Sequence, residues 1–407
     1  MGRSASALTR FAAFRGLILV AGAALLSACA SAPQPGPSAA APSGGGSAQP
    51  APVAAPVNPN APVTLALIAP TTSSSQAAAR AAQDLVAAAQ IAMAERAPAN
   101  LVMKIYDSKG TAAGAAEAAS HAVRDGAALI LGPLLGDGTA AAAPVAAQGG
   151  LSILSFSNDA SVAGGNVWLL GWLPGDEMRR VLGYAGSQGI GRVALVRPAD
   201  RYGDAVSAEA PRAARDAGVS LSPELTYERS FQGIESASQS GAGAILASGA
   251  GGVLIADAGD ALRAMSSFLA YYDVSPRTVR YLGLSRWDDA RNAAESTLQG
   301  GWFAAPDPSS RAAFAAAFES RMARPPSPLA SLGYDGVAAA ADMLRAAQAG
   351  GPVAFSPASI VAAPHEGATG AFRLTPDGLN RRALAVMEMT PNGPALLDPA
   401  PSAAPGV

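Results

Sequence analysis

The sequence predicts an α/β protein with two similar lobes, each a parallel sheet covered by helices. Two observations support this fold class. First, apolar runs such as Val63–Ala69 alternate with Ala-rich segments of helical pattern, and strands without a polar side are typical of parallel sheets buried on both faces. Second, the alternation restarts after residues 168–173, which gives two strand–helix series of similar length. We therefore expect two lobes rather than one extended sheet.

The first lobe is expected to begin at residue 63. Its first strand, 63–69, is followed by a hydroxyl-rich turn at 71–75, whose side chains can cap a helix that runs to Arg96. The other elements of this lobe are strands at 101–106, 127–131 and 151–155 and helices at 111–125 and 138–148. Late helices are predicted at 308–322 and 328–349, so that lobe 1 comprises residues 63–170 and about 302–350.

The second lobe is expected over residues 171–301 and about 367–392. Its helices are predicted at 175–188, 204–217 and 259–271, and its strands at 192–196, 219–226, 252–256 and 279–284. No element is predicted at 227–251, where the pattern is poor. Late strands at 367–373 and 383–390 flank a turn at 375–378. The Pro- and Ala-rich residues 393–407 are expected to form a loose tail.

Residues 1–29 have the composition of a secretory signal peptide. Three arginines precede a short apolar run, and small residues lead to Cys29, the only cysteine of the chain. Leu-Ser-Ala-Cys at 26–29 resembles the lipobox of bacterial lipoproteins, which implies that Cys29 carries a lipid. Because no Asp follows at positions 30 and 31, the resemblance implies an outer-membrane anchor that faces the periplasm. The alternative is an ordinary signal peptide with a chance cysteine.

Residues 30–62 are expected to form a disordered tether between this anchor and the folded lobes. They consist mainly of Ala, Pro, Gly and Ser and carry no charge. A segment of this composition cannot bury enough apolar surface to fold by itself.

The composition excludes several classes of function. A net charge of −2 without a basic cluster argues against nucleic-acid binding, which needs clustered Lys and Arg. One cysteine and two histidines, His121 and His365, leave no ligand set for zinc and no partner for a disulfide. Residues 136–141 imitate a dinucleotide-binding fingerprint, but they follow the third strand rather than the first. With no nucleophile-elbow or Walker A motif either, we expect a non-enzyme without metal or cofactor.

Candidate ligand residues follow the strands of both lobes. In open α/β sheets, ligands bind beyond the carboxyl ends of the strands, and a helix N-terminus there favours an anion. Simple N-capping is the alternative role for the hydroxyls at 71–75, and packing is the alternative role for Trp287 and Trp302. The candidates are Thr71, Thr72, Ser73, Asp137, Thr139, Ser155, Ser157 and Asn158 in the first lobe and Tyr202, Asp257 and Ser285 in the second.

Four motifs stand out in the folded part of the chain: Gly-Pro-Leu-Leu at 132–135, Phe-Ser-Asn-Asp at 156–159, Tyr-Leu-Gly-Leu-Ser-Arg-Trp-Asp-Asp at 281–289 and the segment 298–308. From about residue 62 to 395 the chain resembles type I periplasmic binding proteins. Within that superfamily, the four motifs are similar to one branch, the proteobacterial penicillin-binding protein activator lipoproteins, which are close to the leucine/isoleucine/valine-binding proteins. The resemblance implies a two-lobed binding fold and activation of a peptidoglycan synthase by direct contact.

The sequence departs from the amino-acid binders of that superfamily in one loop. Those proteins carry hydroxyls after the third strand to hold the carboxylate of the ligand, whereas this chain has Leu134, Leu135 and Asp137 there. A carboxylate at this position repels the carboxylate of an amino acid, and Thr139 replaces only part of the clamp. This favours an activator lipoprotein over the alternative, a solute-binding receptor of an ABC importer for branched-chain or related amino acids.

Overall fold

The computed structural model describes residues 56–404 and residue 406. The predicted signal peptide, the lipid site at Cys29 and most of the predicted tether lie outside the described residues.

The first lobe is built on a parallel sheet in the order β2-β1-β3-β4-β5. Its strands are β1 (Val63–Ala69), β2 (Leu101–Asp107), β3 (Leu129–Leu131), β4 (Ser152–Ser155) and β5 (Val167–Leu169). Because successive side chains point to opposite faces, β1 buries Leu65 and Leu67 on one side and Ala66 and Ile68 on the other. Both faces of this sheet are therefore covered, as its continuous apolar strands predict.

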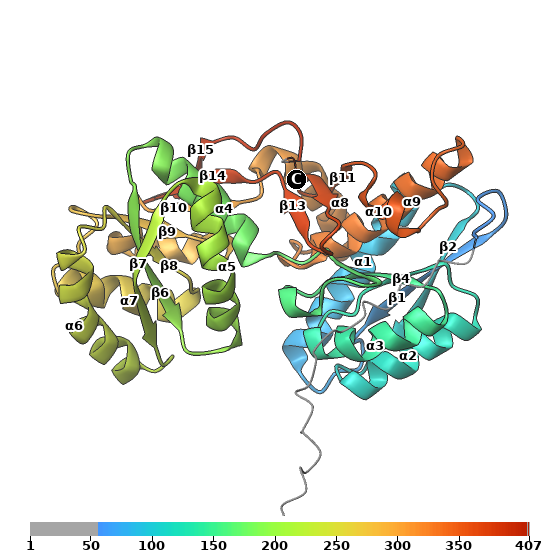
Figure 1. Ribbon diagram of the computed structural model, residues 1–407, viewed down its shortest axis with the longest axis horizontal. Coiled ribbons are helices and arrows are strands. Elements are labelled where there is room, and N and C mark those ends of the chain that lie inside the picture. The colour runs from blue at the N-terminus through green and yellow to red at the C-terminus, as the bar shows by residue number, and fades with distance from the viewer. Residues whose placement is uncertain (1–55, 405, 407) are drawn as a thin grey trace, which may run out of the picture. The chain divides into compact units, whose positions relative to one another are not determined.

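Different helices cover the two faces of the first sheet (Figure 1). One face packs on α2 (Ala112–Arg124) and α3 (Gly136–Gln148). The other packs on α1 (Gln76–Arg96) and on two helices from late in the chain, α8 (Pro308–Met322) and α9 (Ala330–Gln348). Late segments of the chain thus return to the first lobe and complete its core.

The second lobe is built on a mixed sheet in the order β15-β14-β10-β9-β8-β6-β7. Helices α4 (Pro174–Ser187) and α5 (Arg201–Ala217) pack on one face, and α6 (Phe231–Ala247) and α7 (Gly259–Tyr271) on the other. Short 3₁₀ helices at 285–287, 290–294 and 296–298 connect the last parallel strands. The strands are β6 (Arg192–Pro198), β7 (Ser220–Tyr227), β8 (Gly252–Ile255), β9 (Arg280–Gly283), β10 (Trp302–Ala305), β14 (Ala385–Thr390) and β15 (Gly393–Asp398).

A small antiparallel sheet and a short helix complete the fold. The sheet contains β11 (His365–Gly367), β12 (Gly370–Leu374) and β13 (Asn380–Arg382), and α10 (Pro357–Val361) precedes it. Phe372 and Leu374 belong to the core of the first lobe. Arg382 pairs with Asp335 of α9 at 2.8 Å, and both side chains are buried. The turn between β12 and β13 is the one that the sequence predicts at 375–378.

The structure corrects four expectations from the sequence. The strand at 302–305 pairs with β9 and β14, so it belongs to the second lobe and lobe 1 resumes only at α8. Conversely, the hairpin at 370–382 packs on the first core, although it was assigned to lobe 2. Residues 393–398 form strand β15 rather than a loose tail, because they pair with β14. Residues 231–247, for which no element was predicted, form α6.

The predicted tether also ends earlier than residue 62. The side-chain amide of Asn100 donates hydrogen bonds to the carbonyls of Pro59 (2.9 Å) and Ala61 (2.7 Å). Gln348 donates a second bond to Pro59 at 2.9 Å, and Val57 packs against the core of the first lobe. Residues 57–62 are therefore part of the folded lobe. Within residues 56–404, no helix is long and apolar enough to cross a bilayer.

Candidate ligand cleft

A cavity of about 670 Å³ is lined by residues of both lobes. The first lobe contributes residues 134–137, which follow β3 and begin α3, and residues 157–161, which follow β4. The second lobe contributes the first turns of α5, from Arg201 to Glu209. Four of the candidates from the sequence line this cavity together, namely Asp137, Ser157, Asn158 and Tyr202.

Gly203 allows the start of α5, which forms the second-lobe wall of the cavity, to pack closely on the end of β6. The side chain of Asp200 caps α5 by accepting a hydrogen bond from the backbone N–H of Gly203 at 2.9 Å. A Cβ atom on Gly203 would lie only 1.8 Å from the carbonyl oxygen of Pro198 at the end of β6. Only glycine therefore permits the tight entry into α5 that places Arg201 and Tyr202 at the cavity.

Arg201 connects the two lobes across the cavity. Its guanidinium lies 3.4 Å from Asp137, in the first turn of α3, and 3.1 Å from Asp159, in the loop after β4. Hydrogen bonds from Ser161 and the charge of Arg201 lower the pKa of Asp159, so this carboxylate is ionised at neutral pH. The sequence places Asp159 in a candidate loop but gives no sign that Arg201 reaches it.

Two predicted residues lie beneath the cavity and bond to each other. Thr139 and Ser155 are fully buried, and their hydroxyls share a hydrogen bond of 2.8 Å. Thr139 also donates to the carbonyl of Leu135, and Ser155 accepts a bond from the backbone N–H of Ser157. These hydroxyls fix the loops after β3 and β4 and do not line the cavity.

The hydroxyls after β1 are directed elsewhere. Thr72 donates to the carboxylate of Asp107 at the end of the neighbouring strand β2. Ser75 caps α1 by accepting from the backbone N–H of Ala78. Thr71 and Ser73 belong to the same turn, and none of these residues lines the cavity. N-capping, the alternative role that the sequence offers for these hydroxyls, is thus the role of Ser75 at the end of this turn.

The two remaining candidates of the second lobe are held by partners in that lobe. Asp257 accepts from the hydroxyl of Tyr227 and from the guanidinium of Arg229 at 3.0 and 2.8 Å. The backbone N–H and hydroxyl of Ser285 donate to Glu177 at 3.0 and 2.6 Å. Both carboxylates are 3% exposed.

Glu177 and Arg286 are structural features that the sequence analysis missed. Burial raises the pKa of Glu177 to about 7, although the two hydrogen bonds from Ser285 act in the opposite direction. The guanidinium of Arg286 stacks 4.1 Å above the ring of Tyr202, which is a cation–π geometry. No motif marks Glu177, because it lies in the first turn of a helix where acidic residues are common.

The sequence matches the model of one protein family over residues 62–394, and that family is described as periplasmic binding protein. The chain belongs to the periplasmic binding protein family. The two-lobed fold predicted from the sequence is thus confirmed, and the family places the protein in the periplasm. No curated protein sequence matches the chain.

Solved structures of periplasmic binding proteins share this fold at low sequence identity. A branched-chain amino acid ABC transporter ligand-binding protein from Burkholderia xenovorans is 18% identical, with a TM-score of 0.67, over 82% of this chain and 94% of that chain. A putative branched-chain amino acid ABC transporter from Rhodospirillum rubrum is 17% identical, with a TM-score of 0.68, over 82% and 99%. A solute-binding protein from Rhodopseudomonas palustris, solved with 3,4-dihydroxybenzoic acid, is 15% identical, with a TM-score of 0.60, over 84% and 98%.

In a two-lobed binding protein, a cavity lined by both lobes is the expected place for a ligand. This binding protein has such a cavity, but most of the polar residues that the sequence offers as ligand candidates are hydrogen-bonded within their own lobe. Among the described residues, no group of three or more His, Cys, Asp or Glu side chains is arranged to hold a metal ion. The family and the solved structures named above are described as binding proteins.

Proposed function

We propose that this protein is a lipid-anchored regulator in the periplasm, facing inward from the outer membrane, that activates a penicillin-binding protein by direct contact. The observation that carries the proposal is the state of the candidate ligand residues. Four of them are hydrogen-bonded within their own lobe: Thr72 by Asp107, Thr139 by Ser155, Asp257 by Arg229, and Ser285 by Glu177. An amino acid would have to displace these bonds before it could use the same groups.

The charges at the cavity also disfavour an amino-acid ligand. Asp137 and Asp159 stand on the first-lobe side, with Arg201 between them. An incoming carboxylate would be repelled by both Asp residues and would compete with them for the single guanidinium. Leu134 and Leu135 supply no hydroxyl at the place where amino-acid binders of this superfamily carry one. The cleft is therefore better suited to joining the lobes than to capturing leucine.

The choice of a peptidoglycan synthase as partner rests on the sequence. The motifs at 132–135, 156–159, 281–289 and 298–308 resemble those of penicillin-binding protein activator lipoproteins, and Cys29 ends a lipobox-like segment. An anchor at the outer membrane and a Pro- and Ala-rich segment before residue 57 suit a protein that reaches across the periplasm.

A reconstituted synthase assay tests the proposal directly. Glycan-strand synthesis by purified penicillin-binding proteins of the same organism should become several-fold faster when the full-length protein is added. A control with the Burkholderia xenovorans ligand-binding protein, which shares the fold, should have no effect. Unchanged rates with every synthase of the organism would refute the proposal.

The second candidate function is a solute-binding receptor of an ABC importer. It is favoured by the solved structures, which are solute-binding proteins, and by the 670 Å³ cavity, which lies within the size range of small-molecule pockets. We expect leucine, isoleucine and valine to bind with dissociation constants above about 1 mM, equivalent to about −4 kcal/mol. Isothermal titration measures this. Micromolar binding of any of the three would make the importer receptor the better interpretation.

A further inference from the structure

A second cavity, of about 270 Å³, lies in the first lobe beside the cleft. It is lined by residues of two segments, 108–112, which follows β2 and begins α2, and 133–138, which follows β3 and begins α3. Leu135 and Asp137 line this cavity and the cleft cavity alike, so the start of α3 lies between the two. Its volume is just below the range of pockets for drug-sized molecules, and it therefore suits a small ligand.

Helices α2 and α3 both begin at this cavity. The first residue of α2, Ala112, and two residues in the first turn of α3, Asp137 and Gly138, line it. The two first turns are in contact, since a Cβ atom on Gly138 would lie 3.3 Å from the Cβ atom of Ala115. The positive ends of two helix dipoles therefore meet at one place.

The first N–H groups of both helices are free to bind a ligand. Within residues 56–404, the backbone N–H groups of Ala112, Asp137 and Gly138 make no hydrogen bond. Leu135, at the N-cap of α3, has no side-chain acceptor for them. Thr111 caps α2, but its hydroxyl accepts from the N–H of Gly114, at 3.0 Å, and not from that of Ala112. The wall of the cavity thus holds three unused backbone donors.

A buried hydroxyl at the cavity also lacks a partner. Ser108 is 4% exposed and lines the cavity. Its backbone N–H donates to the carbonyl of Ala69, and its carbonyl accepts from the N–H of Thr111, both at 3.0 Å. Among the described residues its hydroxyl has no hydrogen-bond partner, and its Oγ atom is not fully enclosed by protein. Because buried hydroxyls are normally hydrogen-bonded, this one is a donor available to a ligand in the cavity.

The single charge at the cavity is already paired on its other side. Among the described residues that line the cavity, only Asp137 is charged. Its carboxylate lies 3.4 Å from the guanidinium of Arg201, which lines the cleft and not this cavity. This partner offsets part of the repulsion that Asp137 exerts on an anion. The free polar groups at the cavity are donors, which suits a ligand whose polar atoms are acceptors.

We propose that this cavity binds a small oxyanion, a sulfate or phosphate group, through the hydroxyl of Ser108 and the first N–H groups of α2 and α3. Helix N-termini favour anions because their free N–H groups and the helix dipole act together. Hydrogen bonds to an ionised acceptor are also stronger than those between neutral groups. The bound anion braces the start of α3 and thereby the wall that Leu135 and Asp137 give to the cleft. The site is independent of the synthase contact proposed above.

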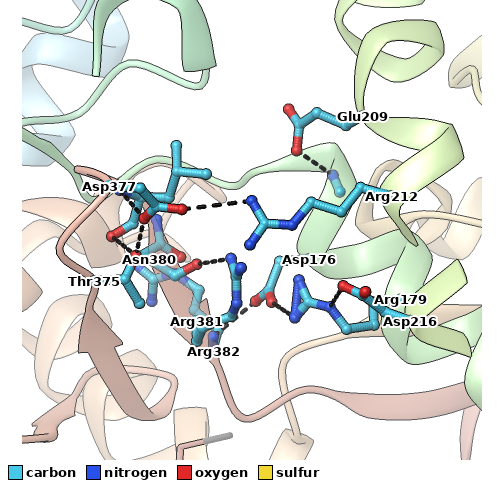
Figure 2. Close-up of polar contacts among 12 residues, drawn as sticks. Asp176, Arg179, Glu209, Arg212, Asp216, Thr375, Asp377, Asn380, Arg381 and Arg382 are labelled. Atoms are coloured by element: carbon cyan, nitrogen blue, oxygen red, sulfur yellow. Dashed lines mark hydrogen bonds and ion pairs between the residues drawn. The ribbon is translucent and has the colours of Figure 1, made fainter. Parts of the chain in front are cut away.

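Isothermal titration of the full-length protein with sulfate and, separately, with inorganic phosphate tests the site. We expect at least one of the two to bind in a 1:1 ratio with a dissociation constant below about 1 mM, and the tighter one identifies the group. Ser108→Ala removes only the free hydroxyl and should weaken that binding at least about tenfold. Arg212→Gln is the control for charge, because Arg212 contacts Asp377 (Figure 2) and does not line the cavity. It should leave the affinity unchanged.

A proline at the start of α2 removes one donor without disturbing the helix. Pro has no N–H and is favoured at the first helical position, and Thr111 before it already has the extended backbone that Pro requires (φ −124°, ψ 153°). Ala112→Pro should therefore unfold like the wild type in urea but bind the anion at least about threefold more weakly. Gln76→Pro makes the same change at the first residue of α1, away from the cavity, and should bind like the wild type.

Three results would overturn the proposal. The first is a wild-type protein that binds neither anion. The second is wild-type affinity in both Ser108→Ala and Ala112→Pro, because the anion would then bind elsewhere. The third is an equal loss of affinity in Arg212→Gln or Gln76→Pro, which would indicate a general effect of charge or of proline.

Discussion

The side chain of Glu177 shows how one buried carboxyl can organise the second lobe. It holds both polar groups of Ser285 and thereby fixes the chain that follows β9 against the start of α4. In doing so it occupies the hydroxyl of Ser285, which the sequence offers as a ligand candidate. A burial of 97% for a carboxyl with only these two bonds explains why its pKa rises to about 7.

This shift predicts a pH dependence of stability. Because the folded-state pKa lies above the ordinary value of 4.5, the folded protein binds a proton that the unfolded chain releases, and the contribution of Glu177 is lost as the pH rises from 4.5 through 7. The free energy of unfolding should therefore fall over this window, by up to about 3 kcal/mol from this group. In Glu177→Gln that part of the decline should be missing.

Urea denaturation of both proteins at pH values of about 5 and 7.5 measures the difference. Asp176, whose pKa is also raised by burial and whose charge adds to the raised pKa of Glu177, remains in both proteins. Identical declines in the wild type and the variant would show that Glu177 is not protonated in the folded protein.

Individual site residues were predictable only where the strand ends indicate them. Asp137, Ser157, Asn158 and Tyr202 follow strands or begin a helix, and all four line the cavity. The partners of the candidates Asp137, Ser285 and Asp257 were not predictable, because Arg201, Glu177 and Arg229 lie on other elements and meet them only through the fold. Sequence position thus indicated four residues that line the cavity, whereas the bonds that satisfy the candidate polar groups depend on tertiary packing.

At the scale of whole elements, the sequence predicts the helices and strands that have strong apolar patterns and does not predict those with weak ones. The four buried residues of α6 are Ile234, Ser238, Ala242 and Ile245, so its inward face has helical spacing but little hydrophobic contrast. Strand β15 begins at Gly393, and most of its residues are partly or fully exposed, so it depends on its pairing with β14. Such elements depend on neighbours that a local pattern does not contain.

The first turn of α5 allows a sharp test of how this helix is positioned. Gly203→Ala should destabilise the protein by about 1–3 kcal/mol, because its Cβ would overlap the backbone of Pro198 and no side-chain movement relieves the contact. Gly243→Ala in α6 is the matched control, since its Cβ meets no atom within 4 Å. That substitution should be neutral or stabilising by up to about 1 kcal/mol.

Chemical denaturation of the two variants beside the wild type measures both effects. If Gly203→Ala were as stable as Gly243→Ala, the close approach of α5 to the end of β6 would not exist in solution.

At the scale of the whole molecule, the proposed activator role makes a demand on the segment before the folded lobes. Residues 31–55 would average about 30 Å as a flexible coil and reach about 80 Å if extended. Deleting them should abolish function in cells without changing the unfolding of the purified protein, and Cys29→Ser should have the same effect because it removes the proposed lipid. A shuffled segment of equal length should retain function, since reach rather than sequence is required.

Growth under a sublethal β-lactam, compared with a full gene deletion, is the readout. Residues 57–62 stay in place in every variant, because they are bonded to Asn100 and Gln348. Normal growth of the short-segment strain would be incompatible with a contact that spans the periplasm, and would favour a receptor that passes a diffusible solute to its importer.

The late position of α9 has a consequence for how the chain acquires its structure. The sheet of the first lobe is synthesised first. Helix α9, which packs against α1 and the face of Leu65 and Leu67, begins only at Ala330. The hairpin that seals this core with Phe372 comes later still. A growing chain therefore carries an uncovered apolar surface until almost all of it has been synthesised, and contacts so distant in sequence form slowly. The first lobe to be translated is thus among the last parts to become stable.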